Sequence, residues 1–170
     1  MHRMKYLPLL LLCVACASTS GSGATPSYLF VQNAQQATLK DGRLTLSEVS
    51  PRAVVFSDRP ERQAGHISNL SLLKAWDGKD AAFSKDPPNA TLAVFNAEEA
   101  IDVVVVLRNP QRDGMTLTYD VTVLEGPASV AGGPAVLFID NLAPWPAVRH
   151  GMHDEPNVVT RNGMHGTGAR

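Results

Sequence analysis

Two neighbouring stretches decide the fold class, DVVVVL at residues 102–107 and TLTYDVTVL at residues 116–124. In the second stretch apolar and polar side chains alternate, which is the period of a strand with one face in a core. The first stretch is apolar on both faces, which predicts a central strand. The intervening residues 108–114 (RNPQRDG) contain Asn-Pro and Asp-Gly, so they predict the turn that joins the two strands.

Further strands are predicted on both sides of this pair. Asp41-Gly42 lies between two short alternating stretches and accepts the positive φ angles of a type I′ hairpin turn. Other short apolar stretches occur at residues 28–31, 53–56, 91–95 and 135–140. Short strands with turn signals between them predict a mainly β fold. We expect an antiparallel β-sandwich of about seven or eight strands, immunoglobulin-like in general architecture.

One short helix interrupts the strand pattern. The apolar residues of this stretch are spaced as on one face of a helix. They are Ile67, Leu70, Leu73 and Trp76. Ser68 is the expected N-cap, because its hydroxyl can accept a hydrogen bond from a free backbone N–H. Ile67 and Leu72 then occupy the two positions of a hydrophobic staple. A helix of about eleven residues is too short to be stable alone, so we expect it to cover one open end of the sandwich.

The composition fits one globular domain without a nucleic-acid partner. Apolar residues make up 44% of the 170 residues, and 15 basic side chains balance 16 acidic ones to a net charge of −1. This balance gives no electrostatic reason to expect nucleic acid. The only cysteines are Cys13 and Cys16, so neither a disulfide framework nor a disulfide-linked partner is expected.

Residues 1–24 have the layout of a signal peptide followed by a flexible tether. A short basic stretch precedes an apolar run at residues 6–15, which is too short to span a bilayer. Cys13-Val14-Ala15-Cys16 resembles a bacterial lipobox, with Cys16 as the lipidated residue, although Cys13 stands where leucine is usual. We therefore expect an exported protein that a lipid anchor holds at a membrane of the bacterial cell envelope. The alternative is cleavage after Ala17 and release of a secreted protein.

The C-terminal residues 143–170 lose the apolar periodicity and are predicted to form an extended or disordered tail after a domain at residues 25–142. The tail contains a short repeat of potential metal ligands, His150, Met152, His153, Met164 and His165. Thioether and imidazole groups together favour copper, Cu(I) in particular. A periplasmic copper-binding protein is therefore an alternative function, and an accidental repeat in a polar tail without a cofactor is the other interpretation.

The most distinctive motif of the domain is Ser57-Asp58-Arg59-Pro60-Glu61-Arg62, which follows a predicted strand. In one interpretation, Asp58, Arg59 and Arg62 belong to a charge network that orders the loop. In the other, the two guanidinium groups clamp a carboxylate or phosphate anion. His66 follows closely and could add a proton-transfer group, so a small hydrolase that uses Asp58, Arg59, Arg62 and His66 is a further alternative.

These stretches also carry a resemblance. The sequence VVFSDRPER at residues 54–62, together with FSKDPPN at residues 83–89 and the strand at 102–107, resembles an uncharacterised family of small secreted or lipid-anchored microbial proteins. The Ser-Asp-Arg-Pro-x-Arg motif is its most specific part, and the resemblance covers residues 28–140. It implies the domain boundaries and the importance of the loop, and it implies no activity.

No enzyme template fits the chain. It contains no G-x-S-x-G elbow, no H-E-x-x-H motif and no phosphate-binding glycine loop. We therefore expect a non-catalytic binding or structural protein of the cell envelope. Its expected partners are the membrane, through the lipid anchor, and a small anion or a protein.

Overall fold

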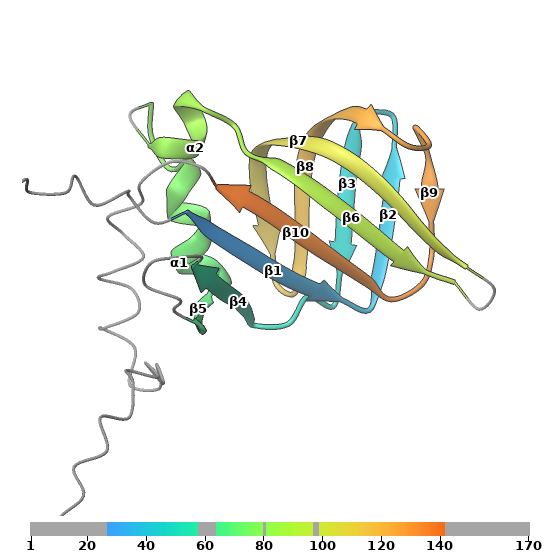
Figure 1. Ribbon diagram of the computed structural model, residues 1–170, viewed down its shortest axis with the longest axis horizontal. Coiled ribbons are helices and arrows are strands. Elements are labelled where there is room, and N and C mark those ends of the chain that lie inside the picture. Colours follow the sequence, from blue (N-terminus) through green and yellow to red (C-terminus); the bar gives the residue numbers. More distant parts are fainter. Residues whose placement is uncertain (1–26, 58–63, 80, 97–98, 142–170) are drawn as a thin grey trace, which may run out of the picture.

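The computed structural model describes residues 27–57, 64–79, 81–96 and 99–141 (Figure 1). Ten strands form one antiparallel sheet in the order β5-β4-β1-β10-β6-β7-β8-β3-β2-β9. The strands are β1 (Tyr28–Ala34), β2 (Gln36–Lys40), β3 (Arg43–Ser47), β4 (Arg52–Ser57), β5 (Ala64–Ser68), β6 (Asn89–Phe95), β7 (Ala100–Asp113), β8 (Thr116–Glu125), β9 (Val130–Ala131) and β10 (Ala135–Asn141). The predicted mainly β, antiparallel fold is confirmed, with ten strands where seven or eight were expected.

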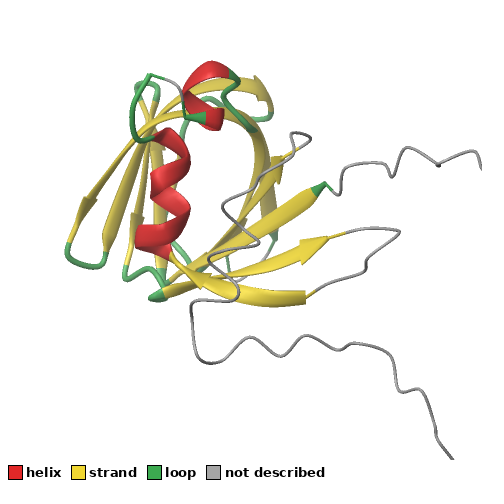
Figure 2. Cartoon of the chain, turned by 90° about the vertical axis from the view of Figure 1, so that its left-hand side faces the viewer, coloured by secondary structure: helices red, strands yellow, loops and turns green. Residues whose placement is uncertain are grey.

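The sheet curls back on itself because a two-stranded ribbon turns a corner. β1 and β4 pair in one half of the sheet, whereas their continuations β2 and β3 pair in the other half. Hydrogen bonds continue around the corner, since the Gln35 N–H donates to the Ser47 carbonyl (3.1 Å) and the Ser50 N–H to the Asn33 carbonyl (2.9 Å). The two halves therefore face each other across one core, as in a sandwich (Figure 2).

Alternation along the strands fills this core. Every second residue of β2, β4 and β8 is buried over most of each strand, as the period of two requires. The largest fully buried side chains are Tyr119, Phe30, Phe83, Leu39, Leu44, Leu46, Leu72, Leu92, Leu107, Leu117, Leu137 and Ile139. Each such side chain contributes about 1.5–3 kcal/mol when it leaves water, so the inward face stabilises the fold.

The hairpin of β7 and β8 differs from the prediction at its turn. β7 continues to Asp113, and the chain reverses at Gly114-Met115, where Asp113 pairs with Thr116. Residues 108–111 instead form an irregularity in the register, with Asn109 at a φ of 46°. A bulge tolerates Pro110, which has no N–H for the ladder. The Asn-Pro signal therefore marks a bulge, and the predicted turn was placed too early.

Three short helical segments lie at one end of the curled sheet: α1 (Asn69–Leu73), the 3-10 segment η1 (Lys74–Trp76) and α2 (Ala82–Lys85) (Figure 2). The predicted N-cap is confirmed, because the Ser71 N–H donates to Ser68 Oγ at 3.1 Å. Leu70 is the exception to the predicted apolar face, with 58% of its surface exposed. The buried positions of α1 and η1 are Asn69, Leu72 and Ala75, so the helix is turned away from the expected face.

Candidate functional site

A chain of buried polar side chains joins α1 to the inside of the sheet. The Tyr119 hydroxyl donates to Gln32 Oε1 (2.8 Å), and Gln32 Nε2 donates to Asn69 Oδ1 (2.9 Å). Asn69 Nδ2 in turn donates to the Ser50 carbonyl (2.6 Å). Burial raises the pKa of Tyr119 well above its usual value, so the hydroxyl keeps its proton and acts as a donor. These uncharged groups fix the start of the helix over the end of the core.

Two hollows border α1, and Leu70 lines both. The first, which we call the aromatic hollow, has a volume of about 480 Å³, and its wall includes Leu73, Lys74, Trp76, Phe83, Arg108 and Pro110. The second, the apolar hollow, has a volume of about 370 Å³, and its wall includes Val49, Pro51, Leu70, Arg112, Met115 and Leu117. Both volumes fall in the range of about 300–1,000 Å³ that is typical of small-molecule sites.

The aromatic hollow combines aromatic rings with cationic groups. The rings of Trp76 and Phe83 meet edge to face, with centroids 4.5 Å apart. Lys74 and Arg108 bring positive charge to the wall, and Asp77 brings one carboxylate. The indole N–H of Trp76 is shielded from water and has no acceptor among the described residues. An apolar planar group would find ring contacts here, and an anionic group would find two cations.

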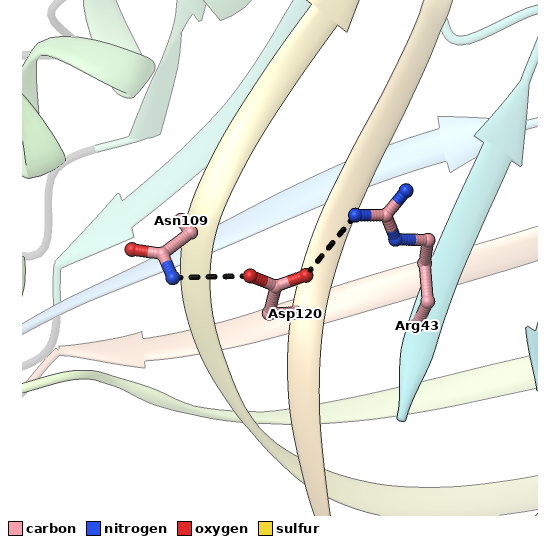
Figure 3. A network of polar contacts seen from close by, with 3 residues as sticks. All are labelled: Arg43, Asn109 and Asp120. Carbon is pink, nitrogen blue, oxygen red and sulfur yellow. Dashed lines mark hydrogen bonds and ion pairs between the residues drawn. The ribbon is translucent and has the colours of Figure 1, made fainter. Parts of the chain in front are cut away.

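A surface network holds the bulge that forms one wall of this hollow. Asn109 Nδ2 donates to Asp120 Oδ2 at 3.0 Å, and Asp120 Oδ1 lies 3.6 Å from Arg43 Nη2 (Figure 3). The pair of Arg43 and Asp120 is exposed, so it adds about 0–1 kcal/mol to stability at most. Arg108 Nη1 also donates to Thr122 Oγ1 at 3.0 Å, which orients its guanidinium. These contacts fix the backbone of β7 against β8 where it turns toward the helices.

The predicted loop site lies only partly within the described residues. β4 ends at the buried Ser57, so the motif does follow a strand, but Asp58, Arg59 and Arg62 lie outside the described residues. His66 lies in β5, where Arg52 Nη1 approaches its Nδ1 at 3.1 Å. Because an arginine only donates hydrogen bonds, Nδ1 can serve only as the acceptor in this contact.

The other predicted site residues also lie outside the described part of the chain. These are Cys16, His150, Met152, His153, Met164 and His165. Within residues 27–57, 64–79, 81–96 and 99–141, no group of three or more His, Cys, Asp or Glu side chains is placed to hold a metal ion. In the same residues, no helix has the length and apolar character that a membrane span requires.

Comparison of the chain with protein-family models, with curated proteins and with solved structures found no significant match. The resemblance that the Ser-Asp-Arg-Pro-x-Arg motif carries therefore stays a prediction.

Sequence reasoning missed the wall of the aromatic hollow. Trp76 was expected only as a core residue, and Arg108 was assigned to a turn. The signal that could have found the site was Asn109-Pro110 within a long strand pair, because a bulge opens space beside a sheet.

Proposed function

We propose that this protein is a non-catalytic binding module of the bacterial cell envelope, and that its ligand occupies the aromatic hollow. The observation that carries the proposal is the meeting of the partly exposed Trp76 ring, packed on Phe83, with two cationic side chains around one space of about 480 Å³. The polar groups buried in the described core, Gln32, Ser57 and Asn69, are uncharged, and Gln32 and Asn69 hold the helix in place. These buried polar groups support a structural role for the interior.

The ligand class follows from the wall of the hollow. Part of the Trp76 indole, which packs on the buried Phe83, faces the hollow and favours a planar apolar group. Lys74 and Arg108 favour a carboxylate, sulfonate or phosphate on the same molecule. A small aromatic anion satisfies both requirements, at a different place from the loop of Asp58, Arg59 and Arg62 for which the sequence suggested an anion.

The fluorescent probe 8-anilinonaphthalene-1-sulfonate tests this site, because it combines aromatic rings with one sulfonate. We expect saturable binding at one site, and a loss of roughly tenfold in affinity for the double variant Lys74→Gln/Arg108→Gln. The matched control is Lys40→Gln, an exposed cation at the end of β2 and outside the hollow, which should leave the affinity unchanged. Equal affinity of the wild type and the double variant would contradict the proposal.

Location in the envelope rests on the leader and on Cys16. If Cys16 is acylated, Cys16→Ala moves the protein from the membrane fraction to the soluble fraction, or blocks its processing. A Cys13→Ala variant is the control, because that cysteine is not the acylated one in the lipobox alignment. If Cys16→Ala is processed and fractionates like the wild type, the lipid anchor is wrong and release after Ala17 becomes the better interpretation.

A further inference from the structure

The bulge in β7 places a cation on the inner side of the sheet. Up to Arg108 the strand pairs with β8 in one register, and from Gln111 onward the register is shifted by one residue. In the shifted register Arg112 pairs with Leu117, where the unshifted register would put Gln111. Residues that pair directly lie on the same face of a sheet, and Leu117 is buried in the core. The bulge therefore turns Arg112 to the core side at the end of the sheet.

Arg112 brings a positive charge to the apolar hollow. Of the described residues that line this hollow, Arg112 alone is charged. Its side chain is exposed, and its guanidinium makes no hydrogen bond or ion pair with another described residue. A guanidinium without a carboxylate partner can bind a carboxylate from solution through two parallel hydrogen bonds.

The two uncharged polar side chains of this wall already have partners inside the protein. Ser68 Oγ accepts a hydrogen bond from the Ser71 N–H (3.1 Å) and lies 2.9 Å from Ser71 Oγ. The amide of Asn69 accepts from Gln32 and donates to the Ser50 carbonyl. A ligand therefore finds apolar contacts and one cation in the hollow. The matching chemistry is an apolar body with a single anionic head.

The apolar part of the wall is anchored in the core but still contacts water. Met115 is 61% exposed and Leu70 58%, whereas Val49 and Leu117 are buried. The Val49 N–H donates to the Met115 carbonyl (2.9 Å), which holds the turn between β7 and β8 against the chain that follows β3. Exposed apolar side chains around a hollow are typical of a binding site, and the thioether of methionine adapts to the shape of an apolar ligand.

We propose that the apolar hollow binds one free fatty acid, with the alkyl chain against Leu70 and Met115 and the carboxylate at Arg112. The volume of about 370 Å³ holds roughly a dozen methylene groups, since each fills nearly the space of a water molecule in the liquid. This is room for one chain of medium length, whereas a membrane phospholipid carries two longer chains. The site differs from the aromatic hollow in its cation and in the class of its ligand.

The first experiment titrates the full-length protein with octanoate, decanoate and dodecanoate in a calorimeter, below the concentrations at which they form micelles. We expect a gain in affinity of about two- to fourfold for each added methylene. Met115→Gln should weaken decanoate binding by roughly fivefold. The matched control is Leu124→Gln, a similarly exposed apolar residue of β8 outside the hollow, which should leave it unchanged. An affinity that does not depend on chain length overturns the proposal. Stronger binding of dihexanoylphosphatidylglycerol, a soluble lipid with two chains, also overturns it and assigns the hollow to a phospholipid.

The second experiment tests the head group by comparing decanoate with decanol, which has the same chain and no charge. We expect the wild type to bind decanoate about tenfold more tightly than decanol, and Arg112→Gln to lose this preference. The matched control is Arg108→Gln, which removes a cation from the aromatic hollow and should keep the preference. The preference is a ratio measured within one protein, so a loss of folded protein does not imitate it. An unchanged preference in Arg112→Gln overturns the proposal.

Discussion

The Tyr119 hydroxyl is the clearest test of the buried polar chain, because Tyr119→Phe removes one oxygen atom and keeps the ring. The ring contact with Trp76, at a centroid distance of 6.0 Å, is retained. What is lost is the hydrogen bond of 2.8 Å to Gln32, whose side chain is only 1% exposed. A buried acceptor left without its donor lowers the free energy of unfolding by about 1–3 kcal/mol. Urea denaturation at neutral pH, followed by circular dichroism, measures this difference.

The same variant predicts a change in alkaline stability. Burial raises the pKa of Tyr119 in the folded protein, whereas the unfolded chain ionises at the usual tyrosine value of about 10. Below that pH both states keep the proton, so this group adds no pH dependence. Above it the unfolded state loses the proton first, and wild-type stability falls by up to about 1.4 kcal/mol per pH unit. The free energy of unfolding of the phenylalanine variant lacks this dependence on pH. The difference in free energy of unfolding between the wild type and the variant should therefore shrink above about pH 10.

Tyr28 provides the matched control. Its hydroxyl is also buried, but it has no hydrogen-bond partner among the described residues. Tyr28→Phe therefore removes no hydrogen bond and should leave the free energy of unfolding unchanged or slightly higher. Equal losses for Tyr28→Phe and Tyr119→Phe would refute the reasoning, because the loss could not then come from the bond to Gln32.

Two further predictions concern local backbone structure, and urea midpoints measure both. Ser68→Ala should lower the free energy of unfolding by about 1 kcal/mol, because the hydroxyl that caps α1 is lost; an unchanged midpoint would mean that the cap does not stabilise the helix. Gly133→Ala should lower it by roughly 2–4 kcal/mol, since φ is +79° and the new Cβ would lie 2.4 Å from the Phe95 carbonyl oxygen. Gly114→Ala, at φ +56° with open space around it, should lose only about 1 kcal/mol, and equal losses at the two glycines would contradict the steric argument.

The parts of the fold that local chemistry determines could be predicted from the sequence. Asp41 and Gly42 have φ angles of 51° and 73°, and Lys40 pairs with Arg43, so the two-residue turn is where the Asp-Gly signal placed it. Alternation at residues 116–124 likewise identified β8. These signals are local because each depends on residues one or two positions apart.

Features that depend on distant partners could not be predicted. Residues 108–113 carry turn signals, yet Arg108 and residues 111–113 pair with β8, whose backbone lies opposite them and supplies the hydrogen-bond partners. Leu70 fits an apolar helix face, but Asn69 is drawn inward by Gln32 and by the Ser50 carbonyl, and this rotates Leu70 toward water. A buried asparagine that forms two good hydrogen bonds replaces the expected leucine, which hydropathy alone does not anticipate.

The candidate site was the least predictable part, because the helical segments at residues 74–85 and a bulge in β7 form it together. Lys74 and Trp76 come from η1, Phe83 from α2, and Arg108 from the bulge in β7. Each of these residues has an ordinary local explanation. Lys74 suits the end of a helix, Trp76 and Phe83 suit a core, and Arg108 suits a turn. The curled sheet alone brings them together, and residue spacing cannot reveal such a meeting.

Stability and binding are coupled at the end of the sheet where this site lies. α1 has five residues and would not form alone, so its position depends on the bonds that Asn69 makes to Gln32 and Ser50. Lys74 and Trp76 follow directly in the chain, and the walls of the aromatic hollow depend on the same anchor. A ligand that binds there binds the anchored state and stabilises it by mass action. The buried polar chain therefore holds a short helix where the side chains that follow it meet those of β7, and the proposed binding site depends on that position.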